Sequence, residues 1–187
     1  DFCHSNGLFL FVDGARLGYG LCAEGCDVTL ADLARLCDVF YIGGTKVGAL
    51  FGEAVVFKGE EMHRSFRYAI KQHGGMLAKG RLLGLQFEQL LKGGDSCLYF
   101  KLARHANAMA AKIRKAFEDK GIAMWIDSPT NMQFPLLTKE QQEILGRKYV
   151  PEFWGRYDSE RDIVRFCTSW ATTQENVDEL CRDIAAL

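Results

Sequence analysis

Short apolar runs that end at glycine-containing pairs organise the first third of the chain. Residues 8–12 form an uninterrupted apolar run that ends at an Asp-Gly pair. Such a run predicts a strand buried on both faces, as in a parallel sheet. Residues 39–42 form a second run, which a Gly-Gly pair ends, and residues 53–57 form a third. We therefore expect three strands in this region, joined by loops in which glycine is frequent.

The remainder of the chain favours helices, followed by a mixture of helices and strands. Residues 99–120 repeat apolar positions at close to the roughly 3.6-residue helical period, which predicts the best helix of the chain, with Gly121 as its C-cap. Further helices are expected over residues 30–37, 82–91, 139–148 and 175–187, the first of them capped by Thr29 and Asp32. Further strands are expected over residues 122–126, 131–136, 153–157 and 163–170. From residue 95 onward this order predicts an α+β layer.

Composition and charge exclude several classes of protein. The 187 residues are 48% hydrophobic, and their 23 basic and 24 acidic side chains leave a net charge of −1. This balance gives no electrostatic reason to expect nucleic acid or an anionic membrane as a partner. No apolar run approaches the roughly 20 residues of a membrane span. The first residue is not Met and an apolar run begins at residue 8, so we expect a piece of a longer protein that lacks its N-terminal part.

Seven cysteines are scattered along the chain, an odd number in a sequence long enough to fold without disulfides. We therefore expect reduced thiols and a cytoplasmic protein. The one loose group of potential zinc ligands is Cys3, His4, Cys22 and Cys26. This group lacks the paired spacing of zinc sites, so no metal is expected.

Three polar residues follow the first two predicted strands. Asp13 ends the first strand, Arg16 comes three residues later, and Lys46 follows the glycine pair after the second strand. Chemistry in open α/β sheets tends to lie beyond the carboxyl ends of strands, where both Asp13 and Lys46 are expected. A partly shielded lysine can act as a Schiff-base nucleophile, because burial favours its neutral amine. The spacing alone is also compatible with a turn aspartate, a surface arginine and a solvated lysine.

A nicotinamide-binding alternative depends on Gly18, Gly20 and Ala23, which match the dinucleotide fingerprint, with Asp38 as the ribose-binding acid. The context does not fit that fingerprint. Five residues separate the strand from the first glycine, and Gly25 interrupts the helix that the fingerprint should open. We therefore do not expect a nicotinamide cofactor.

Four segments resemble the threonine aldolase and β-eliminating lyase family, among the fold-type I pyridoxal-phosphate enzymes of the aspartate aminotransferase superfamily. Residues 12–18 (VDGARLG) are similar to the strand-end motif of the family, and residues 43–57 (GGTKVGALFGEAVVF) to its Schiff-base lysine segment. Residues 73–91 resemble its Gly-Gly-Met helix start, and residues 163–172 its carboxylate-binding strand. The matches run in order over most of the chain.

The resemblance implies a role for each matching residue near the cofactor. Asp13 would pair with the pyridinium nitrogen of pyridoxal 5′-phosphate, Ala15 would lie under the ring, and Lys46 would be the Schiff-base lysine. Thr45 would donate a hydrogen bond to the phosphate. Arg16 would bind either the phenolic oxygen of the cofactor or the carboxylate of the substrate.

Two further basic residues complete the implied site. Arg165 would form a bidentate pair with the carboxylate of the amino-acid substrate. The family commonly has an arginine after its Gly-Gly-Met segment, where this chain has Leu77, so Lys79 is the candidate for the phosphate contact. In the family, the glycine-rich phosphate loop and the ring that stacks on the cofactor lie far upstream of the strand-end motif, so His4 is not expected to be that ring.

The resemblance also implies a fold and an activity. The fold would be α/β, with the C-terminal part of a PLP-transferase-like large domain over residues 1–94 and a small α+β domain over residues 95–187. The activity would be that of a lyase that cleaves a β-hydroxy-α-amino acid, such as threonine to glycine and acetaldehyde, in a homodimer or homotetramer. Alternatives are β-elimination or transamination on the same fold, or a catalytically silent fragment that acts as a structural or interaction module. The chain on its own is expected to lack turnover.

Overall fold

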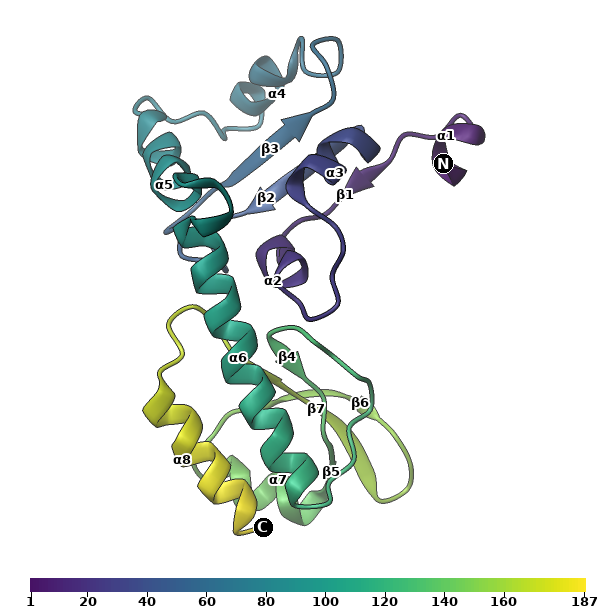
Figure 1. The fold of residues 1–187 in the computed structure, drawn as a ribbon, viewed down its shortest axis with the longest axis vertical. Helices are drawn as coiled ribbons and strands as arrows, with labels where there is room; N and C mark the ends of the chain where they lie inside the picture. Colours follow the sequence, from purple (N-terminus) through teal and green to yellow (C-terminus); the bar gives the residue numbers. More distant parts are fainter. The chain divides into compact units, whose positions relative to one another are not determined.

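The computed structural model describes residues 1–187 and divides them into two compact units (Figure 1). Unit 1 comprises residues 1–21 and 25–101, and unit 2 comprises residues 22–24 and 102–187. Each unit has β-strands of its own that pair only within that unit. No helix is both long enough and apolar enough to cross a membrane.

Unit 1 is built on a three-stranded sheet in the order β1-β2-β3 (Figure 1). The strands are β1 (Phe11–Val12), β2 (Val39–Gly43) and β3 (Glu53–Phe57). β1 runs parallel to β2, whereas β3 is antiparallel to β2. The predictions of strands over residues 39–42 and 53–57 are therefore confirmed, as is the parallel pairing of the first strand.

The expectation that residues 8–12 form a strand buried on both faces is wrong. Only Phe11 and Val12 pair as a strand, and Leu8, Phe9 and Phe11 are 54%, 79% and 59% exposed. The reason is that β1 lies at the edge of the sheet and pairs with β2 alone. An edge strand has no neighbour on its outer side, and no element of unit 1 covers these side chains.

Six helical segments accompany the sheet of unit 1. They are α1 (Phe2–Ser5), α2 (Leu17–Leu21), α3 (Leu30–Leu36), α4 (Phe66–Gln72), α5 (Arg81–Leu91) and the short 3₁₀ turn η1 (Gly94–Ser96). α3 begins with a capping box, in which the Thr29 hydroxyl accepts from the Asp32 N–H and the Asp32 carboxylate accepts from the Thr29 N–H. The predicted helix start at Thr29 is thereby confirmed.

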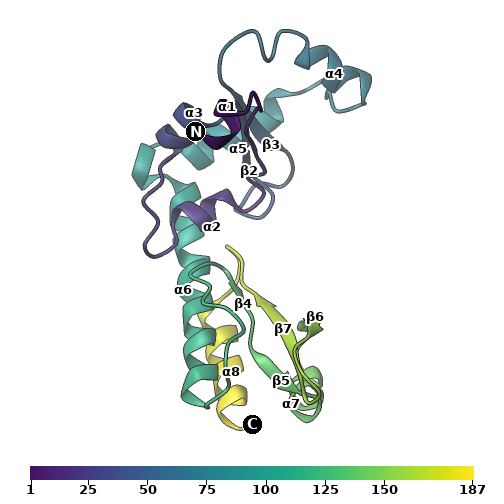
Figure 2. The ribbon, with the colours of Figure 1, turned by 90° about the vertical axis from the view of Figure 1, so that its right-hand side faces the viewer.

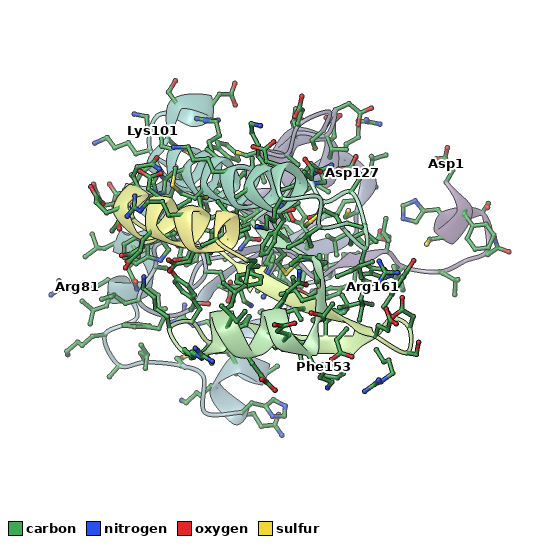
Figure 3. The ribbon with its side chains drawn as sticks, turned by 90° about the horizontal axis from the view of Figure 1, so that it is seen from below. Asp1, Arg81, Lys101, Asp127, Phe153 and Arg161 are labelled. Atoms are coloured by element: carbon green, nitrogen blue, oxygen red, sulfur yellow. The ribbon has the colours of Figure 1, made fainter.

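Unit 2 packs two long helices against an antiparallel sheet. Its elements are α6 (Leu98–Asp119), β4 (Met132–Gln133), β5 (Leu136–Thr138), α7 (Lys139–Gly146), β6 (Glu152–Arg156), β7 (Arg161–Cys167) and α8 (Gln174–Ala185), with the first residues of α6 assigned to unit 1. β7 is the central strand, and β4, β5 and β6 all pair with it. α6 and α8 lie side by side over one face of this sheet (Figures 2 and 3).

One apolar core joins the helices of unit 2 to β7. Its members include Ile113 and Phe117 from α6, Val164 and Phe166 from β7, and Ile184 from α8, all of them less than 10% exposed. The 3.6-residue repeat of α6 places its apolar stripe on this core, as the sequence predicts. Gly121 follows α6 with a φ of 79°, the left-handed conformation of a C-cap glycine.

Two strand predictions in unit 2 need correction. Residues 122–126 form no strand, because only one bridge, between Met124 and Pro135, ties them to the next segment. Residues 131–136 form two strands, β4 and β5, rather than one. Pro135 lies between them and has no N–H to donate to the ladder, which interrupts the pairing with β7.

Candidate active site

Two of the predicted residues, Asp13 and Lys46, lie at one edge of the sheet of unit 1. Asp13 directly follows β1, and Lys46 lies three residues beyond the end of β2. Because these strands are parallel neighbours, their carboxyl ends meet at the same edge. The positive charges of Lys46 and Arg16 both lower the pKa of the Asp13 carboxyl. The structure thus brings together the three residues that strand-end position and spacing select.

Glycines allow the two strand-end loops to touch through their backbones. The Gly43 N–H donates to the Gly14 carbonyl at 2.9 Å. A Cβ at Gly14 would lie 1.6 Å from the Tyr41 carbonyl oxygen, and a Cβ at Gly43 would lie 2.5 Å from the Gly14 carbonyl oxygen. Neither position has room for a side chain, so the glycines of the Asp-Gly and Gly-Gly pairs are required for this approach.

Two side chains fix the loop that carries Lys46. Glu53 is the first residue of β3, and its carboxylate accepts a hydrogen bond from the Gly44 N–H at 2.6 Å. The Tyr19 hydroxyl, from α2, donates to the Lys46 carbonyl. Val47, the next residue, is fully buried. The backbone at Lys46 is therefore held from both sides, while the lysine itself is exposed.

The Asp13 carboxylate is stabilised in its charged form by two hydrogen bonds to the same oxygen. The Tyr41 hydroxyl and the Ala15 N–H, the latter at 3.0 Å, both donate to Oδ1 of Asp13. The Tyr41 bond is the largest cause of the lowered pKa of Asp13, followed by the Ala15 bond. The same contact raises the pKa of Tyr41, so its hydroxyl stays protonated and able to donate. Oδ2 of Asp13 remains open to a further donor.

Tyr41 is a site residue that our sequence analysis missed. The parallel register pairs Val12 with Phe40, so the next pair along the two strands is Asp13 with Tyr41. Tyr41 also sits between the buried residues Phe40 and Ile42, and alternation therefore turns its side chain to the opposite face of β2. The signal in the sequence was the hydroxyl group of Tyr41 within the otherwise apolar run of residues 39–42.

The other residues expected near Lys46 differ in their exposure and in their hydrogen-bond partners. Thr45 is exposed beside Lys46, and Ala15 is half-buried. The Nε atom of Arg16 is buried and has no hydrogen-bond partner, although such groups usually find one. Lys79 is exposed just before α5, and its side chain makes no hydrogen bond or ion pair with any residue.

Arg165 lies in unit 2, on the central strand β7. Its side chain is 18% exposed, and its neighbours Val164 and Phe166 point into the core, as strand alternation predicts. The guanidinium forms an ion pair with Glu152, which lies directly opposite on β6. Its Cζ atom is 5.0 Å from the centre of the Trp154 ring. Arg165 and Glu152 both line a cavity of 470 Å³ next to α8.

Comparison with known proteins gives similarity over nearly the whole chain. No protein-family model matches it. The chain is 30% identical over 184 residues to a low specificity L-threonine aldolase of Pseudomonas aeruginosa, covering 97% of this chain and 51% of that protein. It is 30% identical over 153 residues to the low specificity L-threonine aldolase of Escherichia coli, covering 78% of this chain and 41% of that protein. The chain spans about half the length of the curated relatives it matches.

Solved structures give the same result. A threonine aldolase of Leishmania major is 39% identical and superposes with a TM-score of 0.93, over 98% of this chain and 53% of that one. A serine palmitoyltransferase of Sphingomonas wittichii, 14% identical, superposes with a TM-score of 0.64 over 98% of this chain and 48% of that one, which shows a shared fold. These findings confirm the predicted α/β fold class and the predicted resemblance to threonine aldolases.

The Tyr41 contact makes a prediction about the titration of Asp13. Tyr41→Phe removes the largest cause of the lowered pKa, so the pKa of Asp13 should rise toward its ordinary value of 3.8. The stability that Asp13 contributes is present above pH 3.8 and is lost as the pH falls through the lower folded-state pKa, and the variant should lose the part of this contribution that the Tyr41 bond supplies. NMR titration of the Asp13 carboxyl carbon measures the shift, with Tyr68→Phe as the control because Tyr68 is 76% exposed. An unchanged pKa of Asp13 in Tyr41→Phe would contradict the assignment.

Proposed function

We propose that this protein is a pyridoxal-phosphate-dependent lyase that cleaves the Cα–Cβ bond of a β-hydroxy-α-amino acid, with threonine as the first candidate substrate. One observation carries the proposal: an ionised carboxylate, a primary amine and an arginine meet at the carboxyl ends of two parallel strands. The relatives named threonine aldolases, 30–39% identical over most of the chain, support the choice of reaction.

The residues at this edge fit the proposed cofactor. The lowered pKa of Asp13 keeps a negative charge available for a protonated pyridine nitrogen, and Oδ2 is open to receive its N–H. Lys46 offers an exposed primary amine on a fixed backbone. The unpartnered Nε of Arg16 lacks only an acceptor, which a phenolic or carboxylate oxygen supplies. When bound, pyridoxal phosphate provides the electron sink for the pair of electrons left at Cα.

Each residue then has a distinct task. Asp13 holds the proton on the ring nitrogen, because its carboxylate stays charged at neutral pH and favours the protonated partner. Lys46 would hold the cofactor through its exposed Nζ amine. The small side chain of Ala15 leaves space for a flat ring.

The phosphate and the substrate carboxylate need separate cations or donors. Thr45 supplies a hydroxyl beside Lys46, and Lys79 supplies the positive charge that we assign to the phosphate. Arg165 binds the α-carboxylate of the amino acid through its planar fork. Arg16 is the alternative carboxylate ligand.

Location and assembly are part of the same proposal. We infer a cytoplasmic enzyme, supported by seven free cysteines, since thiols stay reduced in that compartment. We also infer a homodimer or homotetramer. Exposed apolar side chains on unit 1 support an interface there, among them Phe9 (79% exposed) and Leu50 (84% exposed).

Replacing the ring-nitrogen partner tests the proposed cofactor chemistry. Asp13→Asn, in the protein at its natural length, should retain pyridoxal phosphate but lose most of its turnover, because a neutral amide does not stabilise a protonated pyridine nitrogen. Glycine release from threonine measures turnover, and the absorbance of the bound cofactor measures retention. Asp27→Asn, in an exposed loop, is the matched control and should behave as the unmodified protein. Near-normal turnover of Asp13→Asn would show that Asp13 is only a turn residue without a role in the cofactor chemistry.

Replacing the proposed carboxylate ligand tests the substrate class. Arg165→Leu should raise KM for threonine about ten- to a hundredfold, because a hydrogen-bonded charge contact contributes roughly 1.5–3 kcal/mol. Cofactor binding should be unchanged. The control is Arg147→Leu, since Arg147 is exposed and forms no ion pair. An unchanged KM in Arg165→Leu would contradict this role of Arg165, and Arg16 would become the candidate ligand of the carboxylate.

A further inference from the structure

Arg165 already has a carboxylate partner within the chain. Glu152 pairs with Nη2 of Arg165 from the neighbouring strand, at the register position directly opposite. The contact uses one edge of the guanidinium only. Nε of Arg165 is buried and has no acceptor, and Nη1 has only the Met132 sulfur at 3.9 Å. A buried N–H without an acceptor is unfavourable, so the guanidinium is incompletely satisfied by Glu152.

The two members of the ion pair differ in how firmly they are held. The Arg165 side chain is 18% exposed, whereas that of Glu152 is 56% exposed. Glu152 is the first residue of β6, and its side chain makes no hydrogen bond besides the one that its carboxylate accepts from Arg165. Glu152 can turn into solvent at little cost to itself, but its departure leaves the largely buried Arg165 guanidinium without an anionic partner, which a second carboxylate would replace.

Arg165, in contrast, rests on an aromatic support. Its Cζ lies 5.0 Å from the centre of the Trp154 ring, the distance of a cation–π contact. Trp154 packs edge-on against Phe134 with ring centres 5.4 Å apart, and Phe134 is 4% exposed. The register of β6 against β7 shifts between Phe153 and Gly155, so Trp154 is the extra residue of a β-bulge. We therefore expect the guanidinium to stay in place when Glu152 leaves.

We propose that Glu152 is an internal competitor for the α-carboxylate of the substrate, and that Trp154 is the positioning residue that holds Arg165 ready for the exchange. This inference depends on the proposed function of Arg165. A substrate carboxylate that binds in bidentate fashion gives Nε the acceptor that Glu152 does not provide. The exchange thereby favours ligands with a planar, two-oxygen carboxylate over anions that bind through a single oxygen.

Kinetics of Glu152→Gln test the competition. Because the variant removes the competing charge, KM for threonine should fall about two- to fivefold, the range of an ion pair with one exposed partner, with kcat unchanged. Trp154→Leu should raise KM about two- to fivefold by removing the cation–π support. Glu160→Gln is the matched control, since Glu160 lies in the same hairpin and its side chain forms no ion pair. Equal thermal midpoints of the variants show that their folds are intact.

A double variant separates this inference from the proposed function. In an Arg165→Leu background, Glu152→Gln should no longer change KM, because there is no guanidinium left for Glu152 to compete for. If Arg165→Leu raises KM but Glu152→Gln alone leaves KM unchanged or raises it, competition by Glu152 is refuted. The same result retains Arg165 as the ligand of the substrate carboxylate. If Arg165→Leu itself has no effect on KM, the carboxylate site is refuted.

A second measurement does not depend on turnover. Phenylglyoxal modifies accessible arginines, and mass spectrometry reports the rate at Arg165. Glu152→Gln should be modified about two- to fivefold faster at Arg165, with the rate at Arg147 unchanged, and glycine should protect Arg165 of the variant at lower concentration than in the unmodified protein. Equal rates at Arg165 in the two proteins would overturn the proposal.

Discussion

The hydrogen bond from the Gly43 N–H to the Gly14 carbonyl, at 2.9 Å, is the contact on which the site depends. It joins the loops that leave two parallel strands, and only glycine permits that approach, because a Cβ at either position would overlap backbone atoms. Asp13 precedes one of these glycines and Lys46 follows the other. Their convergence is thus a consequence of backbone packing rather than of attraction between their side chains.

Polar contacts then give this edge its chemical character. Tyr41 and Ala15 hold one oxygen of Asp13, which keeps the carboxylate charged and leaves its other oxygen open. Glu53 and Tyr19 secure the backbone around Lys46 without engaging its amine. The protein fixes the backbone and leaves the second oxygen of Asp13 and the amine of Lys46 available, which suits the proposed cofactor.

Local sequence signals predicted the elements well, because their causes are local. The capping box at Thr29, the apolar repeat of α6 and the strand over residues 53–57 each depend on residues close in sequence, and the structure confirms them. The exposure of β1 was missed because burial depends on which strands lie beside it.

The polar partners of the site were missed for a related reason. Tyr41 meets Asp13 across 28 residues and Glu152 meets Arg165 across 13, and both contacts depend on strand register. Alternation predicted the face of Arg165 correctly but said nothing of what lies opposite. Strand-end position selected Asp13 and Lys46, and motif resemblance selected Arg165, whereas their polar partners Tyr41 and Glu152 became visible only when the strands were paired.

Chemical trapping of the cofactor tests the central claim most directly, namely that the strand-end edge of unit 1 holds pyridoxal phosphate through Lys46. The protein is incubated with pyridoxal 5′-phosphate, reduced with borohydride, digested and mapped by mass spectrometry. We predict one dominant label, on Lys46, with Lys58 and the other exposed lysines labelled only at the level of a denatured control. A dominant label on another lysine, or equal labelling of all exposed lysines, would contradict the account.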